Sequence, residues 1–261
     1  MDRVERWNAL LEMLGASGRL TVDETAEKLG VSAATVRRDL DQLAQQQMLV
    51  RTRGGALAGS LSYDLPLRYR TARNASEKQR IGAAAARMVP LGSVVGLNGG
   101  TTTTEAARAL ASRVDLHGNG AAPGVTVVTN ALNIAAELAV RPNVKVVVTG
   151  GVARAQSYEL SGPLATGILN DLTLDVAVIG VDAVDAASGA FSHHEGEASI
   201  TQLMVRRARR VIVVADGTKL GRHAFARICP VGGIDVVVTD TGAPDQAVDE
   251  LSAAGPRVVR V

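Results

Sequence analysis

Apolar positions in the first part of the chain recur at helical spacing and then alternate, which predicts short helices followed by a hairpin. An apolar stripe over residues 4–14 predicts a first helix with Trp7 in the core. A second, short helix is expected over residues 23–29, and Ser32 caps a third over residues 32–47. A short helix, a glycine-containing turn and a capped helix form the pattern of a helix-turn-helix.

The third helix has two distinct faces. Val36, Leu40 and Leu43 fall within about 60° of one another and face the core. The opposite side is small, hydroxylated or basic, which suits the major groove of DNA, because arginine bonds guanine edges or phosphates and small residues allow close approach. A solvated charged face is the alternative, and the capped short-helix context favours DNA contact. The expected contacts are Ser32, Ala33, Ala34, Thr35, Arg37 and Arg38.

Two short strands are predicted over residues 48–57 (MLVRTRGGAL), where Arg51 and Arg53 occupy alternate positions. A basic wing that touches phosphate or the minor groove is the natural assignment. Residues 1–57 carry eight basic and eight acidic side chains, so their net charge gives no argument for DNA binding. The distribution of charge does argue for DNA binding, because the acids concentrate in the first two helices and four arginines lie in the third helix and the wing.

From about residue 77 the pattern changes to apolar runs of strand length that alternate with alanine-rich helical stretches. Runs that are apolar at nearly every position and joined by helices predict a parallel sheet buried on both faces. The fold class is therefore α/β: a winged helix-turn-helix over residues 1–57, a linker over 58–76 and a mostly parallel α/β domain over 77–261. The expected strands are SVVGL, VTVVT, VKVVVTG, LDVAVIG, RVIVVAD, IDVVVTD and RVVRV.

Composition adds limits rather than a function. With 46% apolar and 21% charged residues over 261 positions, the chain can form a substantial core, and its formal charge of +2 indicates no general affinity for nucleic acid. The single cysteine, Cys229, excludes an internal disulfide, and neither a secretory signal nor an apolar run near 18 residues is evident. A cytoplasmic protein without a membrane partner is expected, and 2% aromatic residues argue against a single-strand stacking platform.

One stretch is a candidate anion site: residues 97–110 read LNGGTTTTEAARAL. Glycines after a buried strand let the backbone approach a ligand, and the first N–H groups of the following helix lack partners and favour an anion. No lysine follows the glycines, so this is not the phosphate loop of nucleotide hydrolases. A tight turn with a threonine cap is the alternative interpretation.

Several motifs together resemble the DeoR family of bacterial transcriptional regulators. The segments SAATVRRDL and RGGA carry the likeness in the first domain, and short motifs from Glu77-Lys78 to Asp216-Gly-Thr-Lys219 carry it through the second. The resemblance implies a winged helix-turn-helix joined to a sugar-phosphate sensor domain that is similar in fold to ribose-5-phosphate isomerase. Asn98-Gly99 stands where many relatives have an aspartate–serine pair, which implies a different preference for the sugar portion of the ligand.

The resemblance places the ligand beyond the carboxyl ends of the strands, which is also where open parallel sheets bind ligands. The threonine loop, residues 98–104, would grip the phosphate, Lys219 would add a flexible ammonium, and Asp182 would bond sugar hydroxyls. His193 and His194 are adjacent, but no further ligands at zinc spacing are evident, so neither a metal nor a cofactor is expected. The expected ligand residues are Asn98, Gly99, Gly100, Thr101, Thr102, Thr103, Thr129, Asn130, Gly151, Asp182, Glu197 and Lys219.

These features predict a DNA-binding regulator, most simply a repressor of a carbohydrate-metabolism operon, whose affinity for double-stranded operator DNA is controlled by a phosphorylated sugar. A homodimer or homotetramer is expected, since operator half-sites mirror the symmetry of the protein. The alternative is a sugar-phosphate isomerase or deaminase that acts through the same site. Isomerases carry Asp-Gly-Ala-Asp-Glu where this chain reads Gly180-Val-Asp-Ala-Val-Asp185, so the second acid is out of register and sensing is the stronger interpretation.

Overall fold

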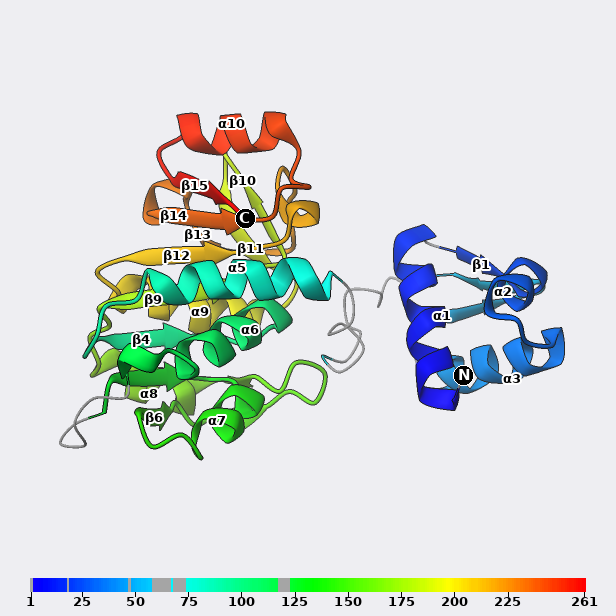
Figure 1. The fold of residues 1–261 in the computed structure, drawn as a ribbon, viewed down its shortest axis with the longest axis horizontal. Coiled ribbons are helices and arrows are strands. Elements are labelled where there is room, and N and C mark those ends of the chain that lie inside the picture. The colour runs from blue at the N-terminus through cyan, green and yellow to red at the C-terminus, as the bar shows by residue number, and fades with distance from the viewer. Residues whose placement is uncertain (1, 18, 47, 58–66, 68–73, 117–122) are drawn as a thin grey trace. The chain divides into compact units, whose positions relative to one another are not determined.

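The computed structural model divides into two compact units, Met1–Arg73 and Asn74–Val261. Figure 1 shows the helices and strands of both. The structure describes every residue except 1, 18, 47, 58–66, 68–73 and 117–122. Most of the linker expected over 58–76 lies outside the described residues, as does the last residue of the expected third helix, and the expected domain boundaries stay a prediction.

The first unit is a winged helix-turn-helix with one strand more than the sequence pattern predicted. Its sheet is antiparallel in the order β1-β3-β2, with Ala56 of the central strand paired to Leu20 on one side and to Arg51 on the other. Trp7 and the three apolar residues of the third helix lie in its core, as expected. The elements are α1 (Arg3–Ser17), β1 (Arg19–Thr21), α2 (Val22–Leu29), α3 (Ala33–Gln45), β2 (Val50–Thr52) and β3 (Gly55–Leu57).

Local signals in the sequence set the turns of this unit. Gly30 has a φ of +64° and ends α2 in the left-handed conformation that glycine favours. The side chain of Ser32 accepts the N–H of Thr35 at 3.1 Å, so α3 begins where the capping signal predicts. Gly55 is required where β3 meets β1, because a Cβ atom there would lie 1.8 Å from the carbonyl oxygen of Leu20.

A parallel sheet of seven strands, ordered β15-β14-β12-β9-β4-β5-β6, forms the centre of the second unit. Every apolar run named above becomes one of these strands. Val178 and Ile212 face one side of the sheet and Ala177 and Val213 face the other, so apolar residues are needed at successive positions. The strands are β4 (Val94–Leu97), β5 (Val125–Thr129), β6 (Val144–Val148), β9 (Val176–Gly180), β12 (Val211–Val214), β14 (Val236–Thr239) and β15 (Arg257–Arg260).

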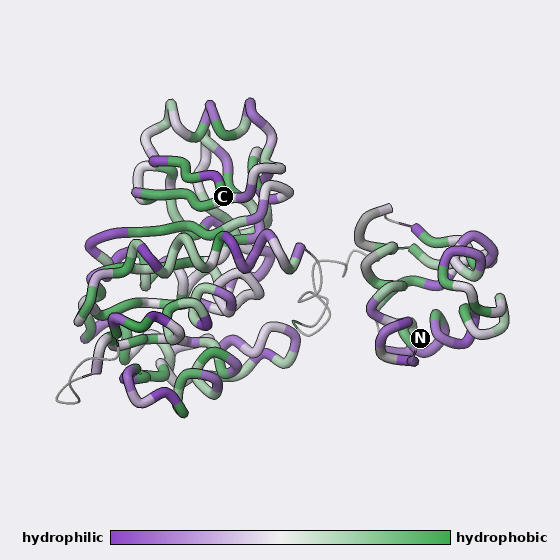
Figure 2. The backbone as a smooth tube through the Cα atoms, in the orientation of Figure 1, coloured by the Kyte–Doolittle hydropathy of each residue, from purple (hydrophilic) through white to green (hydrophobic). Residues whose placement is uncertain are grey.

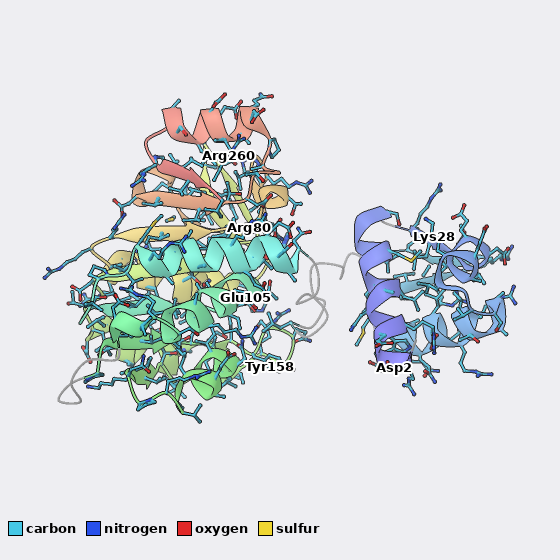
Figure 3. All side chains as sticks on the ribbon, in the orientation of Figure 1. Asp2, Lys28, Arg80, Glu105, Tyr158 and Arg260 are labelled. Carbon is cyan, nitrogen blue, oxygen red and sulfur yellow. The ribbon has the colours of Figure 1, made fainter. Side chains whose placement is uncertain are left out.

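Helices cover both faces of the sheet, and apolar strands (green in Figure 2) lie between them. One face packs against α5, α6 and α7, and the other against α8, α9 and α10. Charged side chains such as Lys28 in the first unit and Arg80 in the second point outward (Figure 3). The helices are α5 (Ala75–Arg87), α6 (Thr101–Ala111), α7 (Leu132–Leu138), α8 (Pro163–Asn170), α9 (Glu195–Arg207) and α10 (Asp245–Ala253), with 3-10 turns η2 (Val114–Leu116), η3 (Gly217–Lys219) and η4 (Val231–Gly233).

Two small antiparallel pieces depart from the parallel pattern. A three-stranded sheet, β10-β11-β13, begins directly after β9, and the hairpin β7-β8 follows β6. Both therefore start from the carboxyl-terminal edge of the sheet, where the ligand is expected. Among the helices described, none combines the length and apolar character needed to cross a bilayer. The strands are β7 (Val152–Ala153), β8 (Leu160–Ser161), β10 (Ala183–Asp185), β11 (Gly189–Ser192) and β13 (Ala226–Cys229).

Candidate DNA interface and effector site

The outward face of α3 carries the residues that the sequence assigns to DNA. Arg37 and Arg38 are exposed on its first two turns, whereas Val36 and Leu40 behind them are fully buried. An open face of small residues and arginines lets a helix enter a major groove. Of the other candidates, Ser32 and Ala34 are exposed, and Ala33 and Thr35 are half-buried.

The inner face of α3 is fixed to α1 by one buried carboxylate. Asp39 Oδ2 accepts from Arg6 Nε at 2.5 Å, and its Oδ1 accepts from Trp7 Nε1 at 3.0 Å and Arg6 Nη2 at 3.2 Å. The Asp39 side chain is 4% exposed and that of Arg6 is 15% exposed. Because three hydrogen bonds converge on one residue, this contact fixes the orientation of α3 against α1.

Asp39 makes the stability of the first unit sensitive to acid. Burial disfavours the charged carboxyl, but hydrogen bonds from Arg6 and Trp7 and the charge of Arg6 outweigh it and lower the pKa of Asp39. A lowered pKa contributes stability above the unfolded-state value of about 3.9, and that stability is lost as pH falls through the folded-state value. We expect Asp39→Asn to cost about 2 kcal/mol at pH 7 and to flatten the decline below pH 4, measured by urea unfolding. An unchanged acid limb would contradict this.

The wing is tied to α3 through Arg51. Its Nε donates to Asp41 Oδ1 at 2.6 Å, and its Nη1 donates to the carbonyl oxygen of Gly55. Arg53 lies exposed in the turn between β2 and β3. Contact of Arg51 and Arg53 with DNA stays a prediction, and Arg53 is the more accessible of the two.

The threonine loop connects the end of β4 to the start of α6. Gly100 has a φ of +124°, and its carbonyl oxygen accepts from Thr103 Oγ1 at 3.1 Å and Thr104 Oγ1 at 2.7 Å. These hydroxyls therefore close the loop on its own backbone, and contact of Thr103 with a ligand stays a prediction. The N–H groups of the first turn of α6 suit an anion, because helix-start N–H groups have no partner within the helix.

Asn98 serves the fold with both polar atoms of its amide. Nδ2 donates to the Gly180 carbonyl at 2.9 Å and to Thr201 Oγ1 at 3.2 Å, and Oδ1 accepts the Gly180 N–H at 2.8 Å. The residue is 4% exposed. The amide joins the ends of β4 and β9 to α9 and so positions the loop that follows it. Direct contact between Asn98 and a ligand stays a prediction.

Glu159 enters this site from the β7-β8 hairpin and was missed by sequence reasoning. It is 5% exposed, Asn130 Nδ2 donates to its Oε2 at 3.0 Å, and its side chain lies against Gly99, where a Cβ atom would be 2.5 Å from Glu159 Oε1. Burial and the neighbouring charges of Glu197 and Asp182 raise the pKa of Glu159 to about 8. The carboxyl is therefore mostly uncharged at neutral pH. A single glutamate in an irregular segment matches no motif, so no sequence pattern marks it.

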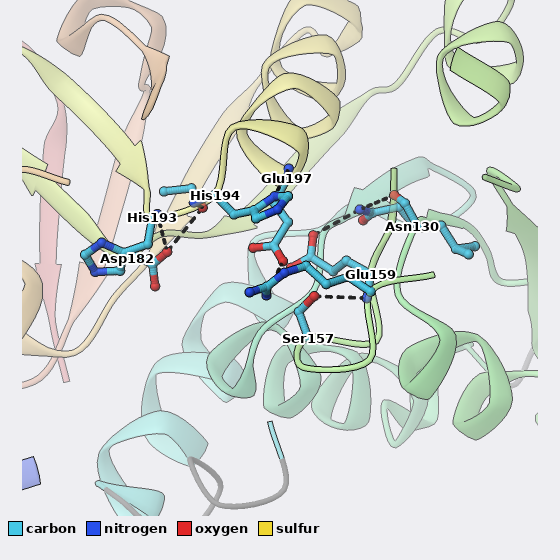
Figure 4. A network of polar contacts seen from close by, with 10 residues as sticks. Asn130, Ser157, Glu159, Asp182, His193, His194 and Glu197 are labelled. Atoms are coloured by element: carbon cyan, nitrogen blue, oxygen red, sulfur yellow. Dashed lines mark hydrogen bonds and ion pairs between the residues drawn. The ribbon is translucent and has the colours of Figure 1, made fainter. Parts of the chain in front are cut away.

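A polar network surrounds Glu159, drawn in Figure 4. Arg154 Nη1 donates to Glu197 Oε1 at 3.1 Å, and the Glu197 N–H donates to His194 Nδ1 at 3.4 Å, which caps α9. Asp182 Oδ2 accepts the His193 N–H at 2.9 Å. Across the described part of the chain, no three histidine, cysteine, aspartate or glutamate side chains are arranged to hold a metal ion.

Other predicted ligand residues lie at or after the ends of β5, β6 and β12. Thr129 is fully buried and its Oγ1 accepts the Ala131 N–H at 3.0 Å. Gly151 has a φ of +118°, and a Cβ atom there would lie 2.7 Å from the carbonyl oxygen of Ser161. Lys219, in η3 after β12, is half-buried, and no contact recorded among the described residues joins its ammonium to the network. Its contact with a ligand stays a prediction.

Comparisons with known families divide the chain as its fold does. Residues 6–60 match the DeoR-like helix-turn-helix domain, and residues 73–241 match the DeoR C terminal sensor domain. The second match alone spans more than half of the chain.

Curated relatives are similar over nearly their whole length. The HTH-type transcriptional regulator GlpR of Haloferax volcanii is 32% identical, covering 98% of this chain and 96% of its own. The glycerol-3-phosphate regulon repressor of Escherichia coli K12 is 29% identical, covering 97% and 96%. The HTH-type transcriptional repressor GlcR of Bacillus subtilis is 31% identical, covering 96% and 93%.

Solved structures overlap this chain more loosely. Ribose 5-phosphate isomerase A from Methanocaldococcus jannaschii overlaps 56% of this chain and 54% of its own, with a TM-score of 0.41 and 19% identity. The sorbitol operon regulator SorC from Klebsiella pneumoniae overlaps 84% and 90%, with a TM-score of 0.36 and 13% identity. Overlaps this loose carry no argument about the site, so identity rests on the family matches and the curated relatives. On that basis the chain belongs to the DeoR family and is a DNA-binding transcriptional regulator.

Proposed function

We propose that this protein represses a carbohydrate-metabolism operon and that a phosphorylated sugar, bound at the carboxyl-terminal edge of the sheet, controls its affinity for operator DNA. The observation that carries the proposal is the presence in one chain of an exposed arginine face on α3 and a strand-end loop whose N–H groups suit an anion. The name of one relative, the glycerol-3-phosphate regulon repressor, supports a phosphorylated ligand. The protein would act in the cytoplasm, where its operator lies.

The proposed switch acts through a homodimer or homotetramer that binds paired operator half-sites. The effector stabilises an arrangement in which the spacing of the DNA-binding units no longer matches that of the half-sites. A coupling free energy of about 1–3 kcal/mol changes operator affinity roughly 5- to 150-fold, which is enough for induction. No covalent chemistry is required of the site.

A thermal-shift screen with pentose phosphates, hexose phosphates and glycerol 3-phosphate tests the proposal. We expect at least one of them to raise the Tm of the second unit and to release the protein from its own upstream DNA in a gel-shift assay at low salt. Failure to shift that DNA in the absence of ligand would contradict the regulatory role. Turnover of a pentose or hexose phosphate would favour an isomerase instead.

Lys219→Ala is expected to separate sensing from DNA binding. Loss of an ammonium from a charge-assisted contact with phosphate lowers effector affinity by about 10-fold, while operator binding without effector stays unchanged. Calorimetric titration with the best ligand of the screen measures the first quantity, and gel shift measures the second. Lys145→Ala is the matched control, because Lys145 is an exposed lysine on the edge strand β6. Equal loss of both activities in Lys219→Ala would contradict the assignment.

A further inference from the structure

A carboxyl group of the same chain, that of Glu159, lies directly beside the threonine loop. Asn130 Nδ2 donates to Glu159 Oε2 at 3.0 Å, and the Glu159 side chain lies against Gly99, the second residue of the loop. Gly99 leaves room for this arrangement, because a Cβ atom at residue 99 would lie 2.3 to 2.5 Å from three side-chain atoms of Glu159. The carboxyl therefore lies beside the loop, in the space that a side chain at residue 99 would fill.

A ligand anion at the loop would lie next to this carboxyl. The N–H groups that would bind the anion belong to the residues that follow Gly99, at the start of α6. Two negative charges side by side in a buried site repel each other strongly, because the effective dielectric constant there is low. A dianion and an ionised Glu159 therefore disfavour one another, whereas a protonated Glu159 adds no such repulsion.

Two further carboxyl groups lie near Glu159. Glu197 faces it from α9 and Asp182 from the end of β9, and both add negative charge. The nearby cation, Arg154, is hydrogen-bonded to Glu197 at 3.1 Å. From the loop that precedes α9, His194 accepts the Glu197 N–H through Nδ1, and the neighbouring His193 donates its own N–H to Asp182.

A second observation concerns Asn130, the residue that donates to Glu159. Asn130 is fully buried, and its Oδ1 has no hydrogen-bond partner among the described residues, although its Nδ2 is engaged by Glu159. A buried acceptor without a donor costs free energy unless a ligand or water supplies one. An effector with hydroxyl groups beside its phosphate offers such donors.

We propose that Glu159 gates the threonine loop, so that a dianionic ligand binds there only while the Glu159 carboxyl carries a proton. The inference rests on the function proposed above and assigns to it the residue that couples effector binding to protons. Since the pKa of Glu159 is about 8, the protonated fraction falls about tenfold between pH 7 and pH 9. Affinity for a dianion should fall by the same factor.

Sulfate is the sharpest probe of this gate, because its own charge stays constant between pH 7 and pH 9. We expect calorimetric titration of the full chain, at constant ionic strength, to give an affinity for sulfate about tenfold lower at pH 9 than at pH 7. Glu159→Gln should bind with nearly the same affinity at both values, since the amide has no proton to lose. Glu250→Gln, which removes an exposed carboxylate on α10, should behave like the wild type.

Proton uptake provides a test that does not depend on a variant. Titrations of the wild type at pH 8.5 in two buffers of different ionisation enthalpy report the protons taken up per sulfate bound, and uptake well above zero is expected. Zero uptake, or the same pH dependence in Glu159→Gln as in the wild type, overturns the gate. In that case a phosphorylated sugar that still stabilises the protein leaves the proposed function intact. Absence of binding by every sugar phosphate at every pH overturns the proposed function itself.

Discussion

Replacing both Arg37 and Arg38 by alanine is expected to weaken operator binding by about 100-fold or more. Both side chains are exposed on the first two turns of α3, on the side away from the core. An arginine that bonds a guanine edge contributes about 1–3 kcal/mol, and loss of a phosphate contact adds to this. Fluorescence anisotropy with a labelled operator fragment at physiological salt measures the change. Because neither residue packs in the core, the Tm should stay within a few degrees of the wild type.

The single variants distinguish a base contact from a phosphate contact, and a control variant shows that the effect is specific to α3. If Arg38 reads a base, Arg38→Ala weakens binding to the operator more than to unrelated DNA, whereas loss of a phosphate contact weakens both alike and reduces the salt dependence. Arg87→Ala, which removes an exposed arginine at the end of α5 in the second unit, should leave binding unchanged. A double variant that still binds within threefold of the wild type would show that α3 is not the reading helix.

Leu40→Ala is expected to destabilise the first unit by about 3 kcal/mol while leaving the second unit intact. Leu40 is fully buried on the inner face of α3, and truncation of such a leucine removes apolar contacts and leaves a cavity. The second unit has hydrophobic clusters of its own, so its unfolding should not follow. Scanning calorimetry is expected to resolve a shifted lower transition and an unshifted upper one.

Leu57→Ala is the matched control for this experiment. Leu57 lies in the same unit, on β3, but it is 44% exposed, so the same truncation should cost less than about 1 kcal/mol. A Leu40→Ala variant that shifts both transitions equally would mean that the two units unfold as one. That outcome would contradict the description of two separate cores.

The architecture could be predicted because its signals are periodic. Strands such as Val176–Gly180 are buried on both faces, so their sequences are apolar at every position and stand out from the helices between them. Likewise Val36, Leu40 and Leu43 recur at helical spacing because one stripe of α3 must face the core. Gly30 marked the end of α2 and Ser32 the start of α3 through capping chemistry that depends only on nearby residues.

The inner workings of the candidate site could not be predicted in the same way. Glu159 lies beside Gly99 and Asn130, which are far from it in the sequence. Its raised pKa comes from burial and from neighbouring carboxylates. Asn98 is a predicted ligand residue because it follows a strand, and the bridge from its amide to Gly180 at the end of the neighbouring strand β9 could not be predicted. Such roles depend on tertiary contacts that no local pattern encodes.

The most direct test of the central claim is release of operator DNA by the effector. Anisotropy of a labelled operator fragment, bound to the full chain near its Kd, is followed while the best phosphorylated sugar from the thermal-shift screen is added at pH 7. The account predicts a saturable fall in anisotropy that corresponds to at least a fivefold loss of operator affinity, with the unphosphorylated sugar inactive at the same concentration. A phosphorylated sugar that binds the protein yet leaves operator affinity unchanged would contradict it.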